Sequence, residues 1–133
     1  MPKLEYFLIS EGISVDQITN RLSIFNVFEN VNAYDFPTRV PLVIAVVSLV
    51  KEDGDQGKDF QLILKIHSPE EEKTFEFSMN FIMKSERHRL LLNVDNMQIK
   101  APGVITFEIY LNGNLLTTRT VNVTLIHTKA DQS

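Results

Sequence analysis

The sequence predicts an all-β protein built from two antiparallel sheets that stack face to face. Hydrophobic and polar residues alternate along five segments, which is the period of a strand with one buried face. Clusters of glycine, proline, asparagine and aspartate separate these segments and are typical of turns. We find no long apolar stripe of helical period, and only residues 14–20 and 83–88 suit single helical turns.

The amount of hydrophobic sequence favours two sheets over one. The chain has 133 residues, 44% of them hydrophobic, and a single sheet with one wet face would need fewer. An immunoglobulin-like or related Greek-key sandwich of about seven to nine strands fits this composition, with a small closed barrel as the alternative. We expect one domain over residues 1–127, followed by a polar tail at residues 128–133.

The first three expected strands, at residues 4–9, 22–28 and 42–47, carry hydrophobic side chains on both faces. In a two-layer protein the outer face meets water, so neighbouring strands of this kind form an apolar patch, and such patches usually mark an interface. The expected patch consists of Phe7, Ile9, Phe25, Val27, Val43, Ala45 and Val47. Homo-oligomerisation is the commonest way to cover it, and the alternatives are a loop or short helix of the same chain or a central position for these strands.

The later strands alternate cleanly. The pattern is clearest at residues 74–81, where phenylalanine and methionine alternate with glutamate, serine and asparagine. It recurs at residues 60–67, 90–95, 105–111 and 121–125. We therefore expect each of these strands to bury one face in the core.

The last two strands form an expected hairpin at Asn112 and Gly113, a pair typical of a two-residue turn. That turn would direct the apolar residues of the final strand, such as Val121, to the wrong face. A three-residue loop with Leu111 opposite Leu115 restores a common apolar face, and we expect a bulged hairpin.

Composition excludes several classes of site. The chain has no cysteine, so it forms no disulfide or thiolate metal site, and this fits a reducing compartment. The formal net charge of -4 argues against nucleic-acid binding. One basic cluster, Lys84, Arg87, His88 and Arg89, suits an anion or a phosphate, although its plainer role is to balance neighbouring carboxylates.

The best candidate for a metal site is a run of carboxylates at Asp53, Asp55 and Asp59. Alternate carboxylates are typical of calcium loops, but Lys58 and Leu64 stand where an EF-hand has glycine and glutamate. A solvated connector is the plainer interpretation. Calcium is therefore a weak alternative, and the sequence predicts no other metal or cofactor.

The sequence predicts no enzyme and no catalytic residue. His67, His88 and His127 lie in separate segments without metal-ligand spacing, and neither a GxSxG nucleophile motif nor a glycine-rich phosphate loop occurs. Our leading hypothesis is a non-enzymatic protein-interaction or structural module that self-associates through its early strands. The alternative is a ligand-binding sandwich whose end loops hold calcium or a carbohydrate.

Targeting features point to a soluble cytoplasmic protein without a membrane segment. The first residues contain an early glutamate instead of a basic and apolar signal sequence. The longest apolar run, residues 42–50, is far shorter than the roughly 20 residues of a membrane helix.

Two stretches carry a family resemblance: residues 11–31, EGISVDQITNRLSIFNVFENV, continuing to Phe36 and Pro37, and residues 101–116, APGVITFEIYLNGNLL. Together they resemble a family of small, uncharacterised bacterial proteins of unknown function. The resemblance implies a single-domain bacterial β-sandwich over most of the chain and no established activity, cofactor or catalytic residue. Residues 18–21 depart from it, because such proteins often have a glycine-containing turn there.

Overall fold

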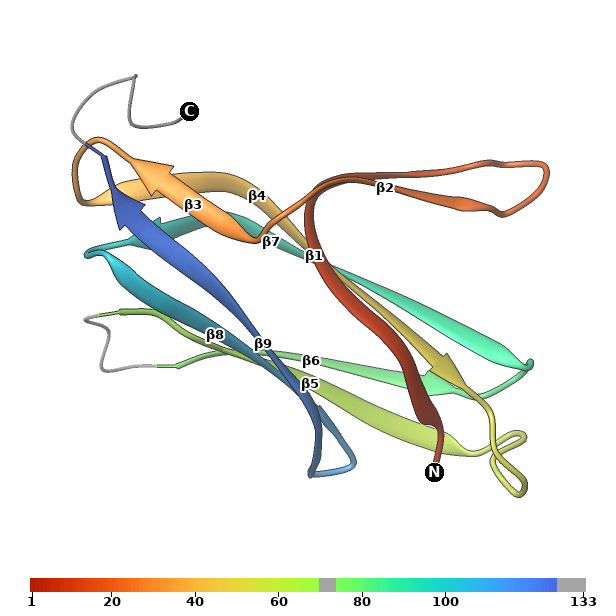
Figure 1. Ribbon diagram of the computed structural model, residues 1–133. Coiled ribbons are helices and arrows are strands. Elements are labelled where there is room, and N and C mark those ends of the chain that lie inside the picture. The colour runs from red at the N-terminus through yellow and green to blue at the C-terminus, as the bar shows by residue number, and fades with distance from the viewer. Residues whose placement is uncertain (70–73, 127–133) are drawn as a thin grey trace.

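The computed structural model describes residues 1–69 and 74–126, and these residues form nine strands in two sheets (Figure 1). The four-stranded sheet has the order β2 (Leu22–Val27), β1 (Lys3–Val15), β4 (Thr38–Val50) and β7 (Arg87–Ile99). The five-stranded sheet has the order β3 (Asn30–Ala33), β9 (Asn114–Leu125), β8 (Gly103–Leu111), β5 (Asp59–His67) and β6 (Phe75–Ile82). The all-β prediction is confirmed. The predicted tail at residues 128–133 and His127 lie outside the described residues.

One prediction about strand direction is wrong. The sheets are not wholly antiparallel, because β3 runs parallel to β9 with Val31 opposite Val123. The chain leaves the four-stranded sheet after β2 and joins the other sheet beside β9 in the same direction. Among the described residues we find no helix long and apolar enough to cross a membrane. Within residues 14–20 the structure has a single turn, closed by a hydrogen bond from the Asn20 N–H to the Asp16 carbonyl, whereas residues 83–88 contain a bend and the start of β7 but no helical turn.

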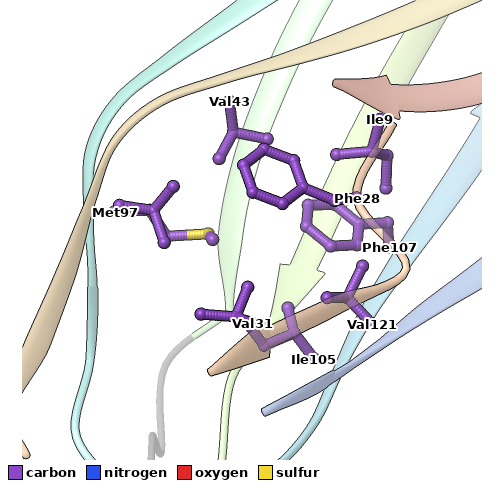
Figure 2. Close-up of a pocket in the computed structure, with 9 residues that line it drawn as sticks. Ile9, Phe28, Val31, Val43, Met97, Ile105, Phe107 and Val121 are labelled. Carbon is purple, nitrogen blue, oxygen red and sulfur yellow. The ribbon is translucent and has the colours of Figure 1, made fainter. Parts of the chain in front are cut away.

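The inner faces of the two sheets share one hydrophobic core. The alternating residues of β5 and β8 are buried, and Leu62, Leu64, Phe107 and Ile109 are at most 1% exposed. These strands therefore bury the faces that their period predicts. The core leaves a cavity of about 10 Å³ whose lining side chains come from both sheets (Figure 2). This cavity has no polar lining, so a water molecule would find no hydrogen-bond partner there.

The β8–β9 hairpin has a different turn from the predicted one, and its bulge lies at a different place. Asn112 and Gly113 both have positive φ, 49° and 84°, and form a two-residue turn with Leu111 opposite Asn114. The predicted three-residue loop is wrong. The predicted bulge exists, but it lies within β9 at Leu116, where one extra residue returns the apolar side chains to the core.

The predicted seven-residue outer patch is wrong for five of its members. Phe7, Ile9, Val43, Ala45 and Val47 belong to the core, with at most 6% of their surface exposed. They share one face because β1 pairs with β4 so that Phe7 lies opposite Val47 and Ile9 opposite Ala45. Where both faces are apolar, the sequence period does not show which one the other sheet covers, and the core covers the face that we expected to be outer.

The opposite face of β4 is covered too, and the cover is the chain itself. Ile44 and Val46 point away from the five-stranded sheet, yet they are only 5% and 0% exposed. The far half of β1 and all of β2 form a hairpin, residues 11–27, that we call the arm (Figure 1). Arg89 of β7 donates hydrogen bonds to Asn20 at the tip of the arm. Because β4 lies between β1 and β7, the arm crosses the outer face of β4 to reach Arg89.

The side chains of the arm agree with this path. Ile13, Leu22 and Ile24 are half-buried, whereas Phe25 and Val27 are 51% and 38% exposed. The first group therefore packs toward the sheet and the second faces solvent. Both alternatives left open by the sequence hold for β4, because it is a central strand between β1 and β7 and a segment of the same chain covers its outer face.

We expect Val46→Ala to lower the free energy of unfolding by about 2 kcal/mol, because it removes two methylene equivalents from a site enclosed by the sheet and the arm. Chemical denaturation measures the change. Val104→Ala is the matched control, since Val104 is 49% exposed and should change stability by no more than about 0.5 kcal/mol. Equal small losses in both variants would contradict a covered outer face.

Candidate functional site

A β-bulge at Glu5 determines which side chains of β1 lie on the outer face of the sheet near the end of β4. Leu4 lies opposite Leu49, but the next pair joins Tyr6 to Ser48, so Glu5 is the extra residue. Without the bulge, Leu4 and Tyr6 would share a face. With it, Leu4 packs on the core while Tyr6 joins Ser48 on the outer face.

A hydrogen-bonded network surrounds the bulged residue. The Glu5 carboxylate accepts a hydrogen bond of 2.7 Å from Arg87 Nε and one of 2.8 Å from Ser48 Oγ. These two bonds, with that from Arg87 the stronger, lower the pKa of Glu5, and Glu5 in turn raises the pKa of Arg87. Glu5 therefore stays ionised and holds Arg87 in place.

The tip of the arm forms the opposite wall. Asp16 Oδ1 accepts hydrogen bonds from the backbone N–H groups of Thr19 and Ile18, which lower the pKa of Asp16. Asn20 has φ of 59° and supplies a left-handed residue in the turn where the similar proteins often have glycine. Its carbonyl and side-chain oxygens accept hydrogen bonds of 3.4 and 3.2 Å from Arg89.

These walls enclose a half-open polar pocket of about 390 Å³. Its lining comes from β1, the tip of the arm, β4 and the start of β7. The lining residues are Glu5, Tyr6, Asn20, Ser48, Arg87, His88 and Arg89. Tyr6, Ser48 and Arg89 form one row across three adjacent strands, because Ser48 lies opposite both of the others. We call this the row pocket.

The structure brings together part of the predicted basic cluster. Arg87 and Arg89 both line the row pocket, but Lys84 lies outside its lining. The imidazole of His88 stacks on Phe81, with ring centroids 4.4 Å apart, and burial lowers its pKa. The sequence indicated the two arginines. Tyr6, Ser48 and Asn20 were missed because only the register of three strands and the path of the arm place them nearby.

The predicted calcium ligands do not converge. Asp55 is 3% exposed, and its carboxylate accepts a hydrogen bond of 2.8 Å from the backbone N–H of Glu52 and lies 3.1 Å from the Met1 amine. Asp53 and Asp59 are exposed. Within the described ranges, no three His, Cys, Asp or Glu side chains are close enough to hold a metal ion.

A second polar network lies on the outer face of the five-stranded sheet. His67 contacts Glu108 through Nε2 and lies 3.1 Å from Thr74 Oγ1 through Nδ1, and Tyr110 donates a hydrogen bond to Glu108. A hydroxyl, an imidazole and a carboxylate in a row are the parts of a nucleophilic triad. The His67 side chain is 45% exposed, so its contacts with Glu108 and Thr74 are open to solvent. We interpret it as a link between strands.

Together these features define an all-β protein with two sheets around one core, an arm across the first sheet and a polar pocket beneath the tip of the arm. A model of the family of unknown function DUF6941 matches residues 5–124, and the chain belongs to that family. This confirms the resemblance to a family without an established activity. No curated protein matches the sequence.

Solved structures match through the fold. One is the alkylpurine DNA glycosylase AlkC of Pseudomonas fluorescens, solved bound to DNA containing an abasic site analog. The TM-score is 0.57 at 8% identity, and the match covers 92% of this chain. This chain spans only 30% of the length of the glycosylase. At this identity the likeness shows a shared fold alone.

We expect Asp55 to make the stability of the protein depend on pH in the acidic range. Burial raises the pKa of Asp55, but the hydrogen bond from Glu52 and the Met1 amine outweigh it and leave the pKa below its usual value. Its contribution is therefore complete above about pH 4 and is lost as the pH falls through the lower folded-state pKa. Thermal melts across this range should show a smaller acid loss for Asp55→Asn, which should also melt several degrees lower at neutral pH. Parallel curves for the two proteins would contradict the assignment.

We expect calcium to bind no more tightly than it does to any exposed carboxylates. Asp55 is already hydrogen-bonded and its neighbours Asp53 and Asp59 point to solvent, so an ion would gain few ligands from the protein. Calorimetric titration of calcium chloride should give no saturable heat. A saturable heat that disappears in Asp53→Asn would overturn this expectation and restore the calcium alternative.

Proposed function

We propose that the protein is a non-enzymatic association module that pairs with a second copy of itself through the edge of the arm. The observation that carries this proposal is the composition of β2. It is the outer strand of the four-stranded sheet and reads Leu-Ser-Ile-Phe-Asn-Val, without a charged residue or a proline. Natural edge strands usually carry such residues to prevent pairing with another chain.

The other long edge strands are protected in this way. β6 contains Glu76, and β7 contains Arg87, Arg89 and Asp95. β3 is also an edge without charge, but it spans only four residues. Among the long edges of the described sheets, β2 is therefore the one that its sequence leaves open to a partner strand.

Two further features of the arm favour a second copy as the partner. Phe25 is 51% exposed and packs beside Gly12, its cross-strand neighbour, so the ring already presents a flat apolar surface. Arg21 and Glu29 flank β2 with opposite charges. In an antiparallel pair of β2 strands, Arg21 of one copy approaches Glu29 of the other, which gives the contact a symmetric electrostatic match.

The wider setting that we propose follows the sequence. Two sheets that share one core, with nine strands, support an immunoglobulin-like or related sandwich. The lack of cysteine fits a reducing compartment such as the cytoplasm, and the family resemblance favours a bacterial protein. A site for calcium or a carbohydrate at the end loops remains the alternative and has less support, because the aspartates of the β4–β5 connector do not converge.

The test is the solution mass over a range of concentrations, by light scattering or sedimentation. The native chain should pass from monomer to dimer, and Phe25→Lys should raise the dimer dissociation constant by about tenfold or more, because a charged side chain on the edge opposes pairing.

Leu115→Lys is the matched control, since Leu115 is 53% exposed on β9, away from the arm. It should dimerise like the native chain, and circular dichroism should show that all three proteins are folded. A native chain that stays monomeric throughout, or equal effects of the two lysines, would rule out association through β2.

A further inference from the structure

We infer that the row pocket binds a small ligand through a phosphate or carboxylate group. The inference is independent of self-association and rests on the donors that the pocket leaves unused, the sign of its charge and the rigidity of its walls.

The first step concerns hydrogen-bond donors. The Tyr6 hydroxyl makes no hydrogen bond within the described part of the chain, although its side chain is half-buried in the pocket. Arg87 uses Nε on Glu5, which leaves its two terminal amino groups free for another acceptor. Arg89 contacts only neutral oxygens of Asn20, at 3.4 and 3.2 Å. Charged donors usually form bonds of about 2.7–2.9 Å, so Arg89 has a weak partner.

The second step concerns charge. Two guanidinium groups line the pocket, and of the described lining residues only Glu5 carries a carboxylate. Glu5 pairs with Arg87, while Arg89 has no ion-pair partner among the residues that the structure describes. The pocket lining therefore keeps a positive charge in a protein whose formal net charge is -4. An oxyanion is the group that this excess attracts, and arginine is the side chain best suited to bind it.

The third step concerns shape. Tyr6 and Arg89 flank Ser48 on the two neighbouring strands, which places their backbones about 10 Å apart at the usual spacing of strands. The pocket that Tyr6, Ser48 and Arg89 line has room for a group the size of phosphate. The volume of about 390 Å³ extends beyond that group, so the ligand has space for a body as well as an anion.

The walls hold these donors in place before a ligand arrives. The bulge fixes Tyr6, Glu5 holds Arg87, and the capped turn at Asp16 sets Asn20 against Arg89. Donors that need no rearrangement bind an anion at less cost in conformational entropy. The mixture of phenol, hydroxyl, amide and guanidinium groups also provides more than one direction of hydrogen bonding, as a specific site requires.

The test measures thermal stability as inorganic phosphate, or in a second series succinate, is added at constant ionic strength. A ligand that binds the folded state raises the melting temperature in a saturable way. We expect at least one of the two probes to do so. Phosphate alone identifies a phosphoryl ligand, succinate alone or both identify carboxylate as an accepted group, and a saturable response to neither overturns the inference.

Variants locate the effect. Arg89→Gln should weaken binding of the active probe by about tenfold or more, as expected for a charge-assisted hydrogen bond, and Tyr6→Phe should weaken it severalfold while keeping the ring. Arg39→Gln is the control, because it removes the same charge from the other end of β4. If Arg89→Gln fails to fold, Arg89→Lys takes its place in the test, because that variant keeps the positive charge. Equal binding by the native chain and the Arg89 and Tyr6 variants would place the anion elsewhere and overturn the inference.

Discussion

The structure depends on the need to cover both faces of β4. Its central residues are apolar on each side, so neither side can face water without a large loss of hydrophobic free energy. The five-stranded sheet covers one side through Val43, Ala45 and Val47. The arm covers the other side, above Ile44 and Val46. A second sheet alone would leave half of this strand unprotected, and the arm is what allows a small chain to keep so hydrophobic a strand.

The polar pocket follows from the same requirement. An arm that crosses β4 must end somewhere, and its tip ends on Arg89 at the start of β7. The apolar cover stops before that point, since the next row across the sheet is Tyr6, Ser48 and Arg89. The sheet and the tip of the arm shield the polar groups in that row, but the pocket remains open to solvent. The arm therefore does two things where it crosses β4: it covers the apolar strand and it forms one wall of the pocket of hydrogen-bond donors.

Sequence reasoning succeeded where the chain obeys one period and failed where it does not. The alternation in β5 and β8 predicted both strands and their buried faces, whereas in β6 it predicted the strand but only Phe81 of the expected face is buried and Phe75 is 52% exposed. In β1 and β4 the apolar residues occupy both faces, and the choice of inner face depends on pairing between distant segments. The bulge at Glu5 shifts that pairing by one residue, which exchanges faces within β1. For this reason the two arginines of the candidate site were visible in the sequence and their partners on β1 and β4 were not.

The arm also joins the two proposed activities. Its edge strand β2 is the surface that we assign to association, and its tip supplies Asn20 to the pocket. An anion that binds Arg89 where Asn20 holds it shares the guanidinium with the tip of the arm. The anion then changes how firmly the tip is held against β7, and with it the free energy needed to order β2 for pairing. Linkage is reciprocal, so any effect of the anion on dimerisation must appear as an equal effect of dimerisation on anion affinity.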